Sequence, residues 1–90
     1  MNWSVYIILC TDSSLYTGIT TDIGRRFEQH KKRKGAKYFR GRQPERLVYV
    51  ENGHNRGSAS KREFAIKNLN PLKKWQLIAS DLNKISVLGL

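Results

Sequence analysis

Two apolar segments near the N-terminus predict an antiparallel hairpin. Residues 3–10 (W-S-V-Y-I-I-L-C) are rich in β-branched and aromatic residues and mostly apolar, which is typical of a well-covered strand. Residues 11–14 (T-D-S-S) have the side chains of a tight turn, and residues 15–20 (L-Y-T-G-I-T) predict a second strand. A third strand is predicted further along, at residues 46–51 (R-L-V-Y-V-E).

The spacing of apolar residues changes to a helical one after the hairpin and again after the third strand. Ile23 and Phe27 are four residues apart and predict a helix over residues 22–32. The run N-G-H-N-R-G, residues 52–57, predicts a loop. We expect a second helix to begin near Ser58 or Ser60 and to continue to about residue 69.

A third, short helix is predicted after Pro71, which suits a first helical position behind a capping Asn70. Its apolar positions are Leu72, Trp75 and Ile78. The resulting order, β-β-α-β-α-α, implies an α+β domain in which helices flank a small three-stranded antiparallel sheet. We assign this domain to residues 1–80 and regard residues 81–90 as a C-terminal tail.

The charge of the chain predicts that the domain binds a partner. Ninety residues suffice for one domain, and 17 Lys and Arg against seven Asp and Glu give a net charge of +10. Such an excess predicts a polyanionic partner, DNA first and RNA second. The single cysteine, Cys10, fits a reducing, cytoplasmic setting without a disulfide partner, and no apolar run is long enough to span a membrane. The sequence does not predict the oligomeric state.

Tyr6 and Tyr16 are candidates for chemistry because one hairpin register brings them together. If Ile8 pairs with Tyr16, Tyr6 pairs with Gly18, and the two tyrosines are diagonal neighbours on one face. The glycine opposite Tyr6 would then leave space for a ligand. A register shifted by one residue would place the tyrosines on opposite faces. Ordinary core packing is the alternative for each of them.

Helix geometry distinguishes between the two arginines of the first predicted helix. At about 100° per residue, Arg26 and His30 lie about 60° and 20° from Ile23 on the side away from Phe27. Arg25 lies about 160° away and should point to solvent. We therefore expect Arg26 and His30 to share the helix edge that faces the sheet. The alternatives are a snorkelling arginine and an ordinary boundary histidine.

Glu63 is a candidate metal ligand with a structural competitor. The run Ser60 to Glu63 (S-K-R-E) fits a capping box that would employ the carboxylate at the helix start. If Ser58 caps the helix instead, Glu63 lies inside it, beside the buried face, and is available to a metal. His54 has no cysteine or second histidine at ligand spacing, and we interpret it as a solvated loop residue.

These residues resemble the GIY-YIG nuclease family. Ser4-Val5-Tyr6 and Tyr16-Thr17-Gly18 look like the two halves of its motif, and the following T-G-I-T-T-D-I-G-R-R-F-E-Q-H is similar to its small single-domain bacterial branch. That branch is similar to the catalytic domains of structure-selective and excision-repair endonucleases, which implies a link to DNA repair. The resemblance covers residues 3–75. Ser4 replaces the first glycine of the family name, Thr17 replaces its second isoleucine, and Ile19 stands where some members have a lysine.

The resemblance implies a divalent-metal-dependent endonuclease with little sequence specificity of its own. By analogy, Glu63 would bind one Mg²⁺ or Mn²⁺. Tyr16 would activate or orient the attacking water, with His30 as its helper or as the alternative base. Tyr6 would position the phosphate or the water, and Arg26 would neutralise charge on the phosphate. The expected nucleic-acid contacts are the basic residues Lys31, Lys32, Lys34, Lys37, Arg40 and Arg42. A non-catalytic DNA- or RNA-binding module on the same scaffold is the alternative. An adaptor that docks an acidic protein is the third possibility.

Overall fold

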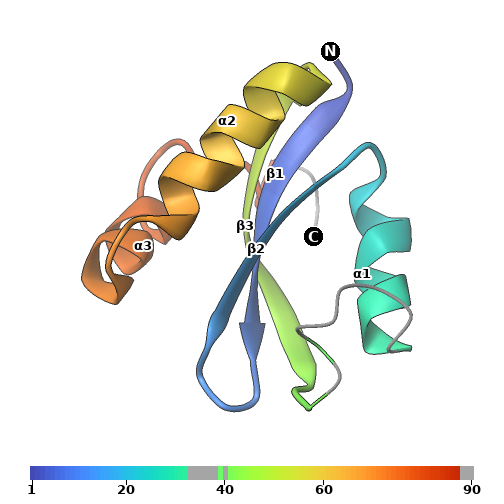
Figure 1. Cartoon of the computed structure of the whole chain (residues 1–90), viewed down its shortest axis with the longest axis vertical. Coiled ribbons are helices and arrows are strands. Elements are labelled where there is room, and N and C mark those ends of the chain that lie inside the picture. Colours follow the sequence, from blue (N-terminus) through green and yellow to red (C-terminus); the bar gives the residue numbers. More distant parts are fainter. Residues whose placement is uncertain (33–38, 40, 88–90) are drawn as a thin grey trace.

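The computed structural model describes residues 1–32, 39 and 41–87 of the chain. A three-stranded antiparallel sheet in the order β2-β1-β3 forms its centre (Figure 1). The strands are β1 (Trp3–Cys10), β2 (Leu15–Thr20) and β3 (Pro44–His54), and the helices are α1 (Ile23–Lys31), α2 (Arg56–Lys67) and α3 (Pro71–Ile78). The observed order β-β-α-β-α-α confirms the predicted α+β fold.

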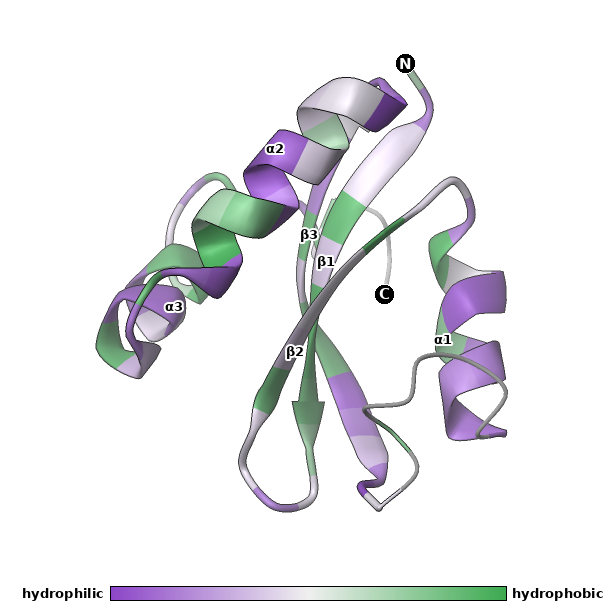
Figure 2. Ribbon diagram, in the orientation of Figure 1, coloured by the Kyte–Doolittle hydropathy of each residue, from purple (hydrophilic) through white to green (hydrophobic). Residues whose placement is uncertain are grey.

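The alternation of side chains along β1 divides the core into two layers. Val5 and Ile7 point to one face, where they pack with Ala59 and Ile66 of α2. The other face carries Tyr6, Ile8, Cys10, Phe39 and Val50, which pack with Ile23 and Phe27 of α1. Helices α1 and α2 therefore cover opposite faces of the sheet (Figure 1). In Figure 2, α1 is largely hydrophilic, which fits a helix that contributes few side chains to the core.

The hairpin register is the predicted one. Ile8 pairs with Tyr16 and Tyr6 pairs with Gly18. Asp22 caps α1 by accepting a hydrogen bond from the Arg25 backbone N–H at 3.1 Å. Helix α1 therefore begins directly after the hairpin, and the hairpin's tyrosine face becomes the face that α1 covers.

The predicted loop at residues 52–57 is wrong. Strand β3 continues to His54, with Gly53 in the left-handed region at φ +82°, and α2 begins at Arg56. Neither Ser58 nor Ser60 is the cap. Asn55 caps α2: its side chain accepts from the Ser58 backbone N–H at 2.8 Å, and the Ser58 hydroxyl accepts from the Asn55 backbone N–H at 3.2 Å.

The third helix starts as predicted, with Asn70 as its cap and Pro71 in its first turn. After α3, the chain turns back along the outer edge of β3. The Asn83 side-chain amide donates to the Val48 carbonyl and accepts from the Val50 N–H, while the Lys84 N–H donates to the Val50 carbonyl at 2.8 Å. None of the helices in the described part of the chain is long and apolar enough to cross a membrane.

Candidate active site

Tyr6 lies at the centre of a buried aromatic cluster, directly opposite Gly18. The side chain of Tyr6 is 1% exposed. A Cβ atom added at Gly18 would lie 2.5 Å from Tyr6 Oη and 2.6 Å from Tyr6 Cζ. Gly18 is therefore required so that the tyrosine ring can cross its neighbouring strand, and the space we expected a ligand to use is filled by the ring itself.

We predict that Gly18→Ala destabilises the domain by about 1–3 kcal/mol, because the added methyl group overlaps a ring that has no free volume around it. Urea unfolding followed by circular dichroism measures the change. Gly24→Ala is the matched control, since the nearest atom to a Cβ there is 3.9 Å away and the position lies in α1. Equal stability of the two variants would contradict the crowding at Gly18.

His30 reaches the same cluster from the last turn of α1. It is fully buried, and its Nε2 lies 2.8 Å from Tyr6 Oη. Burial, reinforced by the nearby charge of Arg26, lowers the pKa of His30 to about 4. Burial and the neighbouring Tyr16 raise the pKa of Tyr6, and Arg26 only partly opposes this. At neutral pH both groups are uncharged, so the Tyr6 phenol can donate to an unprotonated Nε2.

Tyr16 completes the cluster and is its more accessible tyrosine. Its ring centroid lies 5.3 Å from that of His30 and 6.2 Å from that of Tyr6. Phe39, which is fully buried, packs edge-on against Tyr16 at 4.9 Å and stacks obliquely on His30 at 4.5 Å. Phe39 is therefore a core residue. Tyr16 is half-buried, so of the two tyrosines it is the one placed to meet a substrate.

Arg26 lies beside this cluster, on the edge of α1 predicted from helix geometry. Arg26 is half-buried, whereas Arg25 is exposed. One guanidinium nitrogen of Arg26 donates to the Gln29 side-chain oxygen at 3.1 Å. Both arginines and Gln29 line a hollow of about 280 Å³ that also borders Trp3 and Ile19. A hollow with two guanidinium groups is suited to a phosphate.

Glu63 belongs to α2, which covers the other face of the sheet. Because Asn55 and Ser58 form the capping box, Glu63 takes no part in capping and lies inside the helix. Its side chain is 23% exposed and pairs with Lys67 at 3.2 Å. One accessible carboxylate is a suitable donor set for Mg²⁺, which usually keeps several water ligands. The described residues contain no cluster of three or more His, Cys, Asp or Glu arranged to hold a metal.

The predicted nucleic-acid contacts lie at the end of α1 and before β3. Lys31, Lys32 and Arg42 are exposed, as expected. Lys31 forms an ion pair with Glu28 at 3.3 Å, and Arg42 forms one with Asp12 at 2.9 Å. The other three predicted contacts, Lys34, Lys37 and Arg40, lie outside the described residues.

The interpretation of His54 as a solvated loop residue is wrong. Its side chain is 18% exposed, and both ring nitrogens have partners: Ser58 Oγ at 2.9 Å and Glu51 at 2.6 Å. Glu51 also accepts from Tyr49 and from Arg62 of α2. Burial alone would raise the pKa of Glu51, but these hydrogen bonds outweigh it and lower the pKa. This network ties the end of β3 to α2. No local pattern in the sequence marks this network, because its members lie partly in a strand and partly in a helix.

A family model, curated relatives and a solved structure all match this chain. The model of the GIY-YIG catalytic domain family matches residues 2–76. A UPF0213 protein of Desulfotalea psychrophila is 53% identical over 84% of this chain and 70% of its own length, and one of Cronobacter sakazakii is 46% identical over 89% and 84%. The solution structure of a UPF0213 protein from Bacillus halodurans is 45% identical, covers 91% of this chain and 87% of its own, and superposes with a TM-score of 0.58. The chain therefore belongs to the GIY-YIG catalytic domain family.

Proposed function

We propose that the protein is a divalent-metal-dependent endonuclease that hydrolyses phosphodiester bonds in DNA with little sequence specificity of its own. Membership of a nuclease domain family supports an endonuclease-type function. The observation that carries the proposal is the convergence of Tyr6, Tyr16 and His30, with the Arg26 charge beside them. Such a cluster combines groups that can orient or accept a proton with a positive charge, and phosphodiester hydrolysis uses both.

Each side chain of the cluster has a distinct part in this proposal. Tyr16, which is half-buried, orients and helps to deprotonate the attacking water. His30 fixes the ring of Tyr6 through the 2.8 Å bond and supports Tyr16 through the edge-on contact. Since Tyr6 is 1% exposed, its role in positioning the reactants acts through these neighbours. Arg26 binds the phosphate and stabilises the negative charge that grows on it, which is generally a large catalytic effect.

Glu63 would hold the metal ion. A Mg²⁺ or Mn²⁺ ion held there would supply positive charge to the transition state. Because α2 covers the face of the sheet opposite to His30, Glu63 could act together with Tyr16 only across the outer edge of β2. Glu63 is suited to this because it is partly exposed, inside a helix and not engaged in capping. The net charge of +10 and the exposed Lys31, Lys32 and Arg42 would hold the polyanionic backbone.

A non-catalytic nucleic-acid-binding module is the second candidate, and one observation favours it. The Lys67 ammonium group lies 3.2 Å from the Glu63 carboxylate and provides it with a counterion that a metal ion would have to displace. Surface i,i+4 pairs of this kind contribute about 0.3–0.5 kcal/mol, so displacing the lysine costs little.

We predict that the protein nicks supercoiled plasmid in Mg²⁺ or Mn²⁺ and that Glu63→Ala lowers the rate on the order of 100-fold or more, because the charge-neutralising ion is lost. Gel electrophoresis with and without chelator measures the rate. Glu28→Ala is the matched control, since Glu28 is also a helical glutamate paired with a lysine but lies on α1. Binding without nicking in any metal would favour the second candidate.

A further inference from the structure

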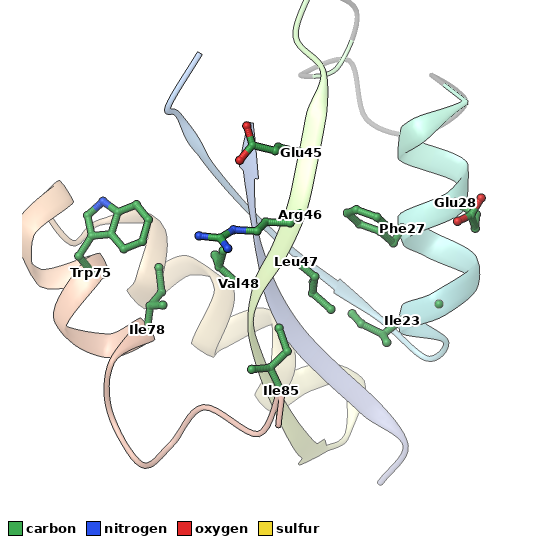
Figure 3. Close-up of a pocket in the computed structure, with 11 residues that line it drawn as sticks. Ile23, Phe27, Glu28, Glu45, Arg46, Leu47, Val48, Trp75, Ile78 and Ile85 are labelled. Atoms are coloured by element: carbon green, nitrogen blue, oxygen red, sulfur yellow. The ribbon is translucent and has the colours of Figure 1, made fainter. Parts of the chain in front are cut away.

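A second cavity lies along the outer edge of β3, at the opposite edge of the sheet from β2. Its volume is about 760 Å³, and its apolar lining comes from three directions: α1, β3 with the segment after α3, and α3 itself (Figure 3). The apolar residues are Ile23, Phe27, Leu47, Val48, Trp75, Ile78 and Ile85. Neither tyrosine nor His30 lines it, so it is separate from the candidate active site.

The cavity follows the strand edge rather than one face of the sheet. Four consecutive residues of β3, Glu45 to Val48, line it. Successive side chains of a strand point to opposite faces, so four neighbours can border one cavity only where it straddles the edge. Figure 3 shows this directly, with Leu47 pointing toward α1 and Arg46 toward α3. In the described part of the chain, this edge is open at residues 45–47, because β3 has only one neighbouring strand and the bonds from Asn83 begin at the Val48 carbonyl.

The next part of the same edge shows what kind of occupant fits. There the protein's own chain pairs with β3: the Lys84 N–H donates to the Val50 carbonyl, and the Asn83 side chain bonds both the Val50 N–H and the Val48 carbonyl. Ile85, the next residue, already borders the cavity. The cavity therefore lies directly next to the part of the β3 edge to which residues 83 and 84 already bond.

The charge and the shape of the cavity indicate which kind of molecule could occupy it. Two acidic residues, Glu28 and Glu45, and one basic residue, Arg46, border the cavity, so it lacks the excess of positive charge that a polyanion needs. In a second copy of the domain, the β3 edge would likewise be recessed between α1 and α3. Two recessed edges cannot come close enough to pair. A single extended segment can enter between the helices.

We propose that this groove binds an extended peptide segment of a partner protein as an additional strand, with alternate apolar residues of the peptide between α1 and α3 and a basic residue near Glu45. Backbone bonds to an open edge would provide affinity, and the two apolar walls would provide selectivity. Four residues of strand span ~13 Å, so the groove takes about four peptide residues. This inference does not rest on the proposed nuclease activity.

A library of capped heptapeptides with apolar residues at alternate positions and one lysine tests the proposal. Fluorescence anisotropy selects the tightest peptide, and amide NMR shifts locate it on the full-length chain. We expect shifts at residues 45–48 and at the Trp75 indole, and at least about tenfold weaker binding to Trp75→Ala. The matched control is Phe64→Ala, which removes an aromatic ring that is 72% exposed on α2, against 41% for Trp75.

Backbone N-methylation of the selected peptide should weaken binding by a similar factor, because it removes the donors for the strand edge. Several results would overturn the proposal: no peptide shifts residues 45–48, Phe64→Ala weakens binding as much as Trp75→Ala, or the methylated peptide binds as well as its parent. A dimer in sedimentation equilibrium that Trp75→Ala dissociates would show a second copy in the groove instead.

Discussion

Replacing Tyr16 by phenylalanine should reduce plasmid nicking by at least about 100-fold while leaving the fold intact. In the proposed mechanism, the Tyr16 hydroxyl is the group of the cluster placed to contact the attacking water, since Tyr6 and His30 are almost fully buried. General acid–base catalysis by one side chain typically contributes 10²–10⁴-fold, and removing the hydroxyl removes that contribution. The ring remains, so the edge-on contacts with His30 and Phe39 at 5.3 and 4.9 Å are preserved.

Tyr49→Phe is the matched control for this variant. Tyr49 is also a buried strand tyrosine, but its hydroxyl bonds to Glu51 in the network at the end of β3. We expect it to lose about 1 kcal/mol of stability and to keep its nicking activity. Circular dichroism and thermal unfolding establish the fold of both variants, and gel assays establish their rates. A Tyr16→Phe protein as active as the wild type would refute the role of Tyr16.

The parts of the fold that the sequence predicts are those where local pattern and tertiary packing agree. The sequence left two hairpin registers open, and the structure has the one that pairs Tyr6 with Gly18, where only a glycine leaves room for the tyrosine ring. The end of β3 was missed because Asn and Gly next to His54 have the composition of a loop. The partners that hold His54 in place, Glu51 and Ser58, lie in a strand and in a helix, so their contact is not visible in a local pattern.

Part of the candidate site was also predictable from the sequence, and part was not. Helical phase placed Arg26 and His30 toward the sheet and Arg25 toward solvent, and burial confirms this arrangement. The cap of α2 was not predicted: we considered Ser58 and Ser60, whereas the cap is Asn55, which lies in the segment that we predicted to be a loop. The choice of Asn55 depends on where β3 ends, which is a tertiary property.

Acid should destabilise this domain through His30, and the sign of the effect follows from its pKa. The pKa is about 4 in the folded protein and about 6.5 in an unfolded chain, so between these values the unfolded state binds a proton that the folded state does not. Stability is therefore fully present above pH 6.5 and is lost as the pH falls toward 4. A difference of about 2.5 pKa units corresponds to about 3 kcal/mol, a large part of the 5–15 kcal/mol that stabilises typical domains.

The measurement is the free energy of unfolding in urea at a series of pH values between 7 and 4, for the wild type and for His30→Gln. Carboxylates titrate in the same interval in both proteins, so the difference between the two slopes isolates the histidine. We expect His30→Gln to be less stable at pH 7, because the bond to Tyr6 is changed, but to lose about 3 kcal/mol less on acidification. Parallel curves for the two proteins would show that His30 accepts a proton in the folded state, and the uncharged phenol–imidazole pair on which the proposed site depends would then be wrong.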